Sequence, residues 1–170
     1  MRELDDIYRT PLKKVLDEIR EWKRGKGQYA RYATRNIRKD QIILSLKNIS
    51  RKTDRSTAYT IRYDQDIYYE PLSGVYYLNH SCNPSGYICF DDFTFRALRE
   101  IEEGEELTFH YCTTEFALSA PFRCLCGSDS CLAYIRGFRF LNVKEQIRLL
   151  PLLSPFLKRF LSCTKPHHRT

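Results

Sequence analysis

The sequence predicts a mainly β domain with flanking helices and a cysteine-rich lobe towards the C-terminal end. Three observations support this fold class. Between residues 28 and 110, short runs rich in Tyr, Ile, Thr and Phe alternate with turn residues, which is typical of many short strands. Apolar residues recur at helical spacing on both sides of this region. Finally, three cysteines fall within residues 124–131.

The first element expected is a helix near the N-terminus. Thr10 and Pro11 can serve as its N-cap and first position, and the RGKG stretch at 24–27 ends it. The apolar residues at helical spacing are Leu12, Val15, Leu16, Ile19 and Trp22. We therefore expect an N-terminal helical segment over residues 1–23.

Short strands are expected next, separated by turns at Asp91-Asp92 and Glu103-Gly104. The runs are YATRNI (32–37), QIILSL (41–46), TAYTIRY (57–63), DIYYE (66–70), GYICF (86–90), FTFRAL (93–98) and EELTF (105–109). Helices follow the cysteines. Asn142 and Glu145 form a capping-box pattern, and Ser154-Pro155 opens a second short helix.

Composition narrows the class of protein. Apolar residues make up 42% of the chain, enough for a core, and no apolar run is long enough to span a membrane. The first residues, MRELDDIYRTP, lack the apolar stretch of a signal peptide, so we expect a cytoplasmic or nuclear protein. The net charge of +7 favours either simple solubility or attraction to an acidic partner such as DNA or a nucleosome. Seven cysteines without an export signal favour metal binding or buried thiols over disulfides.

The cysteines at 124–131, CLCGSDSC, have the pattern C-x-C-x4-C. A closed structural zinc site takes four ligands, preferably thiolates, so three are here and one must come from elsewhere. The candidates are Cys82, Cys89, Cys112, Cys163 or a histidine. Cys82 sits in a loop, whereas Cys89 lies inside an apolar strand pattern. The alternative is a set of unrelated buried cysteines.

Three motifs occur in a recognisable order: NHSCNP at 79–84, GEELTFHY at 104–111 and then CLCGSDSC. Together they resemble the SET-domain protein lysine methyltransferases that carry a post-SET zinc segment. YATRNIRKDQII resembles the opening strands of the same family, and the similarity covers about residues 24–137. The resemblance implies the SET-domain fold, small curved sheets with a pseudoknot-like crossing. It places the SET domain at 24–118, the post-SET zinc segment at 119–137 and a C-terminal helical extension at 138–170.

The resemblance also implies a site. Tyr111 matches the catalytic tyrosine, and Phe109 matches the channel position that controls how many methyl groups are added. The implied S-adenosylmethionine contacts are Gly25, Gly27, Tyr29, Asn79, His80 and Tyr111. The implied zinc ligands are Cys82, Cys124, Cys126 and Cys131.

Two positions depart from the family pattern. The interval from Gly27 to Arg35 is longer than usual, so either QYAR contains an insertion or Ala30 takes the place of the second glycine. His110 replaces an aspartate and could tune the pH dependence or simply lie at the surface.

The function implied is an S-adenosylmethionine-dependent protein lysine N-methyltransferase that makes di- or trimethyllysine on a histone or another protein. The alternative is a non-catalytic, zinc-bearing SET-like module that binds chromatin or nucleic acid. The basic charge is compatible with a nucleosome or DNA contact in either case. Transfer of a labelled methyl group to any protein separates the two.

Overall fold

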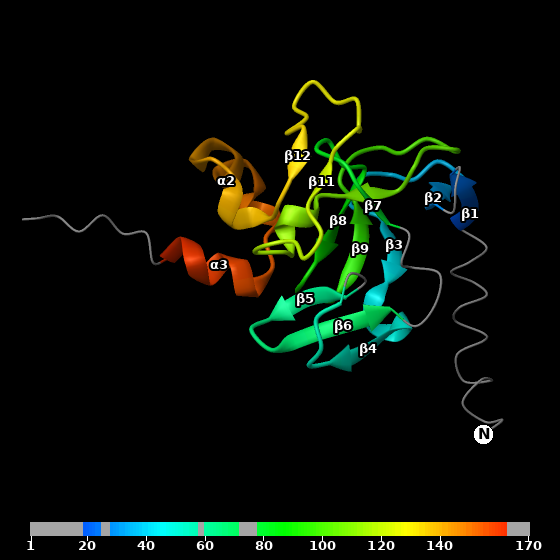
Figure 1. Ribbon diagram of the computed structural model, residues 1–170. Helices are drawn as coiled ribbons and strands as arrows, with labels where there is room; N and C mark the ends of the chain where they lie inside the picture. Colours follow the sequence, from blue (N-terminus) through cyan, green and yellow to red (C-terminus); the bar gives the residue numbers. More distant parts are fainter. Residues whose placement is uncertain (1–18, 25–27, 58–59, 72–77, 163–170) are drawn as a thin grey trace, which may run out of the picture.

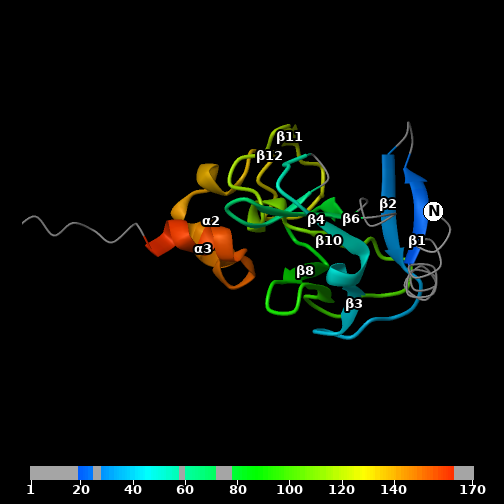
Figure 2. The same ribbon diagram turned by 90° about the horizontal axis from the view of Figure 1, so that it is seen from below.

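The computed structural model describes residues 19–24, 28–57, 60–71 and 78–162. In these ranges the strands form several small sheets of two or three strands each. Helices α2 and α3 lie at one end of the molecule and the pair β1–β2 at the opposite end (Figure 1), and the rotated view keeps this separation (Figure 2). Within the described ranges, no helix has the length and apolar character needed to cross a membrane.

The expectation of an N-terminal helix is wrong at residues 19–23, because this stretch is a strand. β1 (Ile19–Arg24) pairs antiparallel with β2 (Gln28–Ala33) along its whole length. Pairing with a second strand satisfies the backbone of β1 and overrides the local helical periodicity, which is only a weak determinant of structure. Arg24, the first residue of the RGKG stretch, is the last residue of β1, and residues 25–27 lie outside the described residues. Residues 1–18 lie outside the described residues.

The central sheet has the order β3–β9–β8 and carries the main core. Its strands are β3 (Ile42–Ser45), β8 (Gly86–Cys89) and β9 (Thr94–Ala97). The predicted hairpin around Asp91-Asp92 is confirmed, because β8 and β9 pair antiparallel on either side of it. Phe95 of β9 is fully buried, and a Cβ at Gly86 would lie only 2.4 Å from its ring. Glycine is therefore required at position 86.

A second sheet, ordered β4–β6–β5, packs against this core through aromatic side chains. Its strands are β4 (Ser50–Thr53), β5 (Ile61–Asp64) and β6 (Ile67–Pro71). Tyr63 and Tyr69 contact Phe93 of the core, with ring centroids 5.6 and 4.3 Å apart respectively. β5 begins later than the TAYTIRY run predicts, since described residues 57 and 60 are not part of the strand.

A short parallel pair joins two segments that are distant in sequence. β7 (Asn79–His80) pairs with β10 (Thr108–Phe109), and the whole β8–β9 hairpin lies between them in the chain. Parallel neighbours require such a crossover connection, and this one agrees with the pseudoknot-like crossing that the family resemblance implies. The turn at Glu103-Gly104 is confirmed, with φ +84° at Gly104. The strand predicted over EELTF is shorter than expected and covers only Thr108–Phe109. In the YATRNI run, the strand ends at Ala33, and Ile37 forms only an isolated bridge with Ile101.

The C-terminal part forms a separate layer of short elements. These are β11 (Phe122–Arg123), β12 (Tyr134–Ile135), α2 (Val143–Leu149) and α3 (Pro155–Ser162). The predicted capping box is present, because Asn142 Oδ1 accepts from the N–H of Glu145 at 2.9 Å. Turns of 3₁₀ helix occur at Leu46–Ile49, Tyr111–Thr113, Phe138–Phe140 and Leu150–Leu152.

This layer packs on a second core and holds the chain that follows Tyr111. The cluster includes the buried side chains of Ile135, Phe138, Leu149, Leu153, Phe156 and Leu157 together with three cysteines. The N–H of Ser154 donates to the carbonyl of Thr113, and the N–H of Phe138 to that of Glu115, each at 2.8 Å. An ion pair between Arg159 and Asp64 connects α3 with β5. The C-terminal segment therefore braces residues 113–118.

Candidate active site and metal centre

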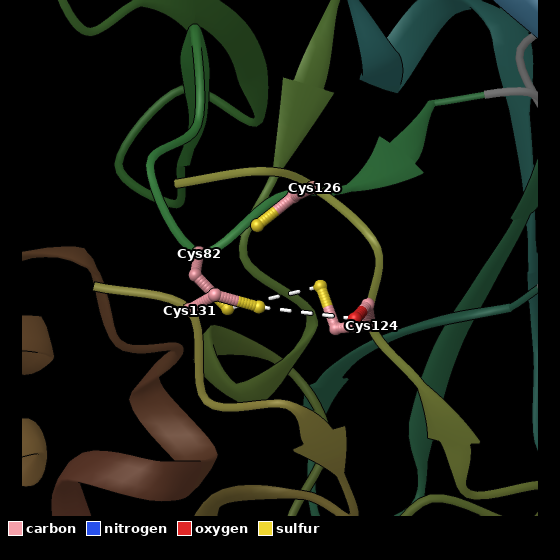
Figure 3. Close-up of side chains that lie close together, drawn as sticks. All are labelled: Cys82, Cys124, Cys126 and Cys131. Carbon is pink, nitrogen blue, oxygen red and sulfur yellow. Dashed lines mark hydrogen bonds between the residues drawn. The ribbon is translucent and has the colours of Figure 1, made fainter. Parts of the chain in front are cut away.

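Four cysteine sulfurs from two distant parts of the chain come together beside the crossing, the parallel pair of β7 and β10. Cys82 lies just after β7, whereas Cys124, Cys126 and Cys131 come after the end of β11. All four sulfurs lie within 4.8 Å of one another, and the Sγ atoms of Cys82 and Cys124 are 3.9 Å apart. Figure 3 shows the four side chains converging from different loops. The structure thus brings together the four cysteines that the family resemblance implies as ligands.

The geometry of this donor set fits a tetrahedral zinc ion. Zn–S bonds of about 2.3 Å place the sulfurs of a tetrahedron about 3.8 Å apart, close to the separation of Cys82 and Cys124. The N–H of Leu132 donates to Cys82 Sγ at 3.3 Å, which stabilises a thiolate there. Gly127, between the second and third cysteines of the motif, has φ +70° and lets the chain turn back.

The thiols differ in how readily they lose a proton. Burial raises the pKa of Cys82 well above its usual value and raises that of Cys124 to about 11. Burial also acts to raise the pKa of Cys126, but hydrogen bonds from the backbone of Cys82 and Ser128 and from neighbouring thiols lower it to about 6. A bound cation would be needed to hold Cys82 and Cys124 as thiolates at neutral pH.

The other two cysteines in the described part of the chain do not contribute a sulfur to this group of four. Cys89 is half-buried in β8, and Cys112 is buried in the second hydrophobic cluster. Neither belongs to the group of four converging sulfurs. Cys163 lies outside the described residues.

His80 connects the cysteine cluster to Tyr111. Its Nδ1 accepts a hydrogen bond from the backbone N–H of Tyr111 at 3.2 Å, and its Nε2 lies 3.4 Å from Cys82 Sγ. Because Nδ1 accepts, the proton of the neutral ring is on Nε2 and points at the sulfur. Burial lowers the pKa of His80 to about 4, so the ring is neutral at physiological pH. One imidazole therefore orients both the candidate ligand Cys82 and the backbone of Tyr111.

His110 is buried, with 1% of its surface exposed, so the interpretation as a surface residue is wrong. Burial, with the nearby His80, lowers its pKa to about 3. The ligand atoms of His80, Cys82 and His110 also lie within 4.8 Å of one another. However, Nδ1 of each ring already accepts a backbone hydrogen bond, from Tyr111 and Cys112 respectively. The remaining nitrogen carries the proton and has no lone pair for a metal, which favours the four-thiol set.

Side-chain hydrogen bonds fasten the NHSC loop to the segment before Tyr111. Asn79 Nδ2 donates to Glu106 Oε1 at 2.8 Å. Ser85 and Thr108 bond reciprocally: the N–H of each donates to the hydroxyl of the other, at 3.1 and 2.9 Å. These contacts fix Asn79 and His80 relative to β10.

Tyr111 and Phe109 lie on the wall of a cavity of about 230 Å³. The Tyr111 hydroxyl donates to the carbonyl of Leu78 at 3.1 Å. Its ring lies between Phe109 and Phe122, with centroids 4.9 and 5.9 Å away. Burial and the nearby Glu106 raise the pKa of Tyr111 to about 12, so the phenol keeps its proton at neutral pH. The cavity therefore has an aromatic wall on which the Tyr111 hydroxyl is held in a fixed orientation.

The expected cofactor contacts are described only in part. His80 contacts Tyr111 directly, and Asn79 precedes His80 in β7. Gly25 and Gly27 lie outside the described residues, and for Tyr29 only its place in β2 is described. β2 itself runs beside the same segment, because the N–H of Leu107 donates to the carbonyl of Arg31 at 2.7 Å.

Some residues of the site were missed by the sequence interpretation. Phe122 closes the cavity next to Tyr111, Ser85 fastens the crossing, and Glu115 lines the cavity wall. Phe122 stands two residues before Cys124, and this position next to the C-x-C-x4-C motif could have indicated that it belongs to the site. Glu115 in the run TTEF belongs to no motif and carries no comparable signal.

Glu115 is half-buried, and the other described residues that line the cavity carry no charge. Burial raises its pKa to about 7, against the opposing effect of the Arg62 charge and backbone N–H. The folded state therefore binds the proton of Glu115 more tightly than the unfolded chain does, and folding stability falls as pH rises from the unfolded pKa of about 4.5 to about 7.

Glu115→Gln should accordingly stabilise the protein at alkaline pH. Linkage gives a gain of about 3 kcal/mol at pH 8 that shrinks to about 2 kcal/mol at pH 6, because the wild-type carboxyl is protonated there. Urea unfolding at the two pH values measures this difference. Glu103→Gln, in the exposed turn, is the matched control and should change stability little at either pH. Equal stabilities of wild type and Glu115→Gln at both pH values would contradict the expectation.

Comparison with known proteins identifies the family. A SET-domain profile matches residues 28–112, from the start of β2 to just past Tyr111. The chain belongs to the SET-domain family. The match includes Asn79, His80, Phe109 and Tyr111, so the crossing described above is that of a SET domain. The three cysteines of the C-x-C-x4-C motif lie beyond it.

Several relatives of this SET domain are methyltransferases by name. The methyltransferase flvH of Aspergillus flavus is 37% identical over 95 residues, covering 55% of this chain and 52% of the relative. The histone-lysine N-methyltransferase ASHH2 of Arabidopsis thaliana is 25% identical over 138 residues, 66% of this chain but 8% of the relative. Among solved structures, the methyltransferase domain of human SETMAR has a TM-score of 0.48 at 18% identity, covering 68% of this chain and 56% of that one. The chain thus spans about half of flvH and a small part of ASHH2.

Proposed function

We propose that this SET-domain protein is a protein lysine N-methyltransferase that uses S-adenosylmethionine. The observation that carries the proposal is the aromatic cavity in which the Tyr111 hydroxyl is held by the Leu78 carbonyl, directly beside Asn79 and His80. Positioned polar groups in an apolar cavity are what the transfer of a methyl group to an amine requires.

The residues can be given roles. S-adenosylmethionine, when bound, supplies a methyl group activated on a sulfonium. Asn79, His80 and Tyr111 would hold it, together with Gly25, Gly27 and Tyr29. An apolar, aromatic wall lowers the pKa of an entering lysine ammonium, which favours the free amine. Tyr111 stays protonated and donates to Leu78, so its oxygen lone pairs are available to orient the amine, and the phenol does not act as a base.

The proposal includes a structural zinc centre, with Cys82, Cys124, Cys126 and Cys131 as its four ligands. A zinc ion there would supply the positive charge that keeps four thiolates together. Cys82 belongs to the NHSC loop, whereas the other three lie in the chain that brings Phe122 to the cavity. Metal binding would therefore fix one wall of the cavity relative to another.

Phe109 supports di- or trimethylation as the product state. A phenylalanine cannot hold a water molecule by a hydroxyl, so the space beside the amine can accept a methyl group. Phe109→Tyr should therefore shift the product towards monomethyllysine while activity persists. Mass spectra of a substrate peptide taken to completion give the product distribution.

The matched control for that substitution is Phe140→Tyr, which adds the same hydroxyl at an exposed position. It should leave the product distribution unchanged. A wild type that stalls at monomethyllysine with excess cofactor present would mean that the channel is narrower than proposed.

The names of two relatives suggest the substrate class. ASHH2 is a histone-lysine N-methyltransferase, and a relative from Eremothecium gossypii, 33% identical over 67 residues, is specific for lysine 36 of histone H3. We propose a histone, met on the nucleosome, as the first substrate to test, with a nuclear location. The net charge of +7 suits contact with nucleosomal DNA.

Transfer of tritiated methyl groups to free histones, nucleosomes and whole lysate tests the proposal, with mass-spectrometric mapping of the modified residue. Methyl groups on lysine support an enzyme. Nucleosome binding without transfer to any of the three would instead favour the non-catalytic module.

A further inference from the structure

Among the described residues that line the cavity beside Tyr111, Glu115 is the one charged side chain. The rest of this described lining is apolar, aromatic or hydroxyl-bearing, and it comes from residues 56–57 and 60–61, Pro71, Leu78 and the chain from 109 to 122. A lone carboxylate in such a wall is an electrostatic marker for a cationic ligand. The overall charge of +7 gives no long-range attraction for a basic peptide, so any such selection must be local.

The backbone of Glu115 is fixed on both sides. Its N–H donates to the carbonyl of Tyr111 at 3.0 Å, and its own carbonyl accepts from Phe138 at 2.8 Å. It therefore stands one turn after Tyr111 and is braced by the C-terminal segment. A group held in this way can discriminate between ligands, because little has to be ordered upon binding.

The carboxyl of Glu115 interacts with the Arg62 backbone N–H, the Thr114 hydroxyl and the Arg62 charge, and these partners only partly offset the effect of burial on its pKa. The Arg62 guanidinium bonds the Tyr68 hydroxyl at 2.9 Å through Nε and lies over the Phe156 ring at 4.2 Å. No ion pair joins Arg62 to Glu115 in the part of the chain that the structure describes. Even with Arg62 nearby, burial keeps the pKa of Glu115 at about 7, the mark of an incompletely compensated charge.

We propose that Glu115 selects protein substrates in which a basic side chain, arginine or lysine, lies close in sequence to the methylated lysine. The carboxylate pairs with that second cation inside the cavity while the target lysine faces Tyr111. The inference rests on the proposed lysine methyltransferase function and adds the substrate class to it. If Glu115 only ties β5 to the chain after Tyr111, flanking charge will have no effect on turnover.

The experiment uses the full chain and a set of peptides with one central lysine in a Gly/Ser/Ala background. Each flanking position is occupied in turn by Arg, Lys, Ala or Glu, and kcat and KM are measured with tritiated S-adenosylmethionine. At one or two positions, Arg or Lys should raise kcat/KM about tenfold over Ala, mainly through KM, as expected for a charge-assisted pair in a partly buried site.

Variants assign the preference to the carboxylate. Glu115→Gln should reduce the preference in kcat/KM for Arg or Lys over Ala to about twofold. Glu115→Lys should instead favour peptides with Glu at that flanking position. Glu103→Gln should keep the wild-type preference. Circular dichroism and melting curves establish that each variant is folded.

The outcomes separate the two proposals. A wild type that methylates no lysine in peptides, histones, nucleosomes or lysate overturns the proposed function. A wild type that methylates peptides without regard to flanking charge, or a folded Glu115→Gln variant that keeps the full preference, overturns the role of Glu115 alone.

Discussion

Tyr111→Phe should cut methyl transfer by about a hundredfold or more while the fold and cofactor binding stay nearly intact. The substitution removes one hydroxyl, which in the wild type donates to the Leu78 carbonyl and presents its oxygen to the cavity. Loss of one positioned electrostatic group costs about this much in other enzymes. Because the ring still packs between Phe109 and Phe122, little else should change. Single-turnover rates and calorimetric titration with S-adenosylmethionine measure the two effects separately.

Tyr134→Phe provides the matched control, because Tyr134 is 55% exposed on β12 and away from the cavity. It should retain the wild-type rate. An undiminished rate for Tyr111→Phe would show that another group orients the amine.

Loss of the metal should have the second large effect. We expect about one zinc per chain by elemental analysis, since four converging thiols form a closed site. Removal by a chelator under reducing conditions, or Cys124→Ser, should destabilise the protein by about 3 kcal/mol or more, because the binding free energy of a structural zinc contributes directly to folding. Methyl transfer should fall in parallel, since Cys82 and the chain around Phe122 lose their common anchor.

Cys89→Ser separates this effect from the general cost of replacing a cysteine. Cys89 is half-buried in β8 and outside the cluster, so its variant should keep one zinc and near wild-type stability. A metal-free protein with the melting temperature of the wild type would refute the zinc centre.

The parts of the structure that could be predicted are those with local or motif-level signals. The hairpin at Asp91-Asp92 and the capping box at Asn142 depend on neighbours in the sequence, and both are present. The convergence of Cys82 with the 124–131 motif is not local, and only the order and spacing of three motifs indicated it. The family resemblance therefore supplied the long-range information that periodicity lacks.

The parts that could not be predicted depend on partners far away in the chain. Residues 19–23 have helical periodicity but pair with β2, which decides their structure. In the sequence, His110 is a polar residue after a predicted strand, yet in the structure it is buried and its ring packs against that of His80. Glu115 acquires its environment only when β5 and the C-terminal segment pack around the end of the crossing.

The parallel pairing of β7 with β10 has a kinetic consequence. His80 and Tyr111 are 31 residues apart in sequence, so their contact forms only after a loop of that length has closed. Loop closure of this size costs entropy before any contact repays it, and proteins dominated by such non-local pairings fold slowly. The β8–β9 hairpin can form within the loop beforehand, whereas the crossing must wait for both of its ends. The residues that orient Tyr111 would then be assembled late in folding, and substitutions among them would be felt mainly as faster unfolding.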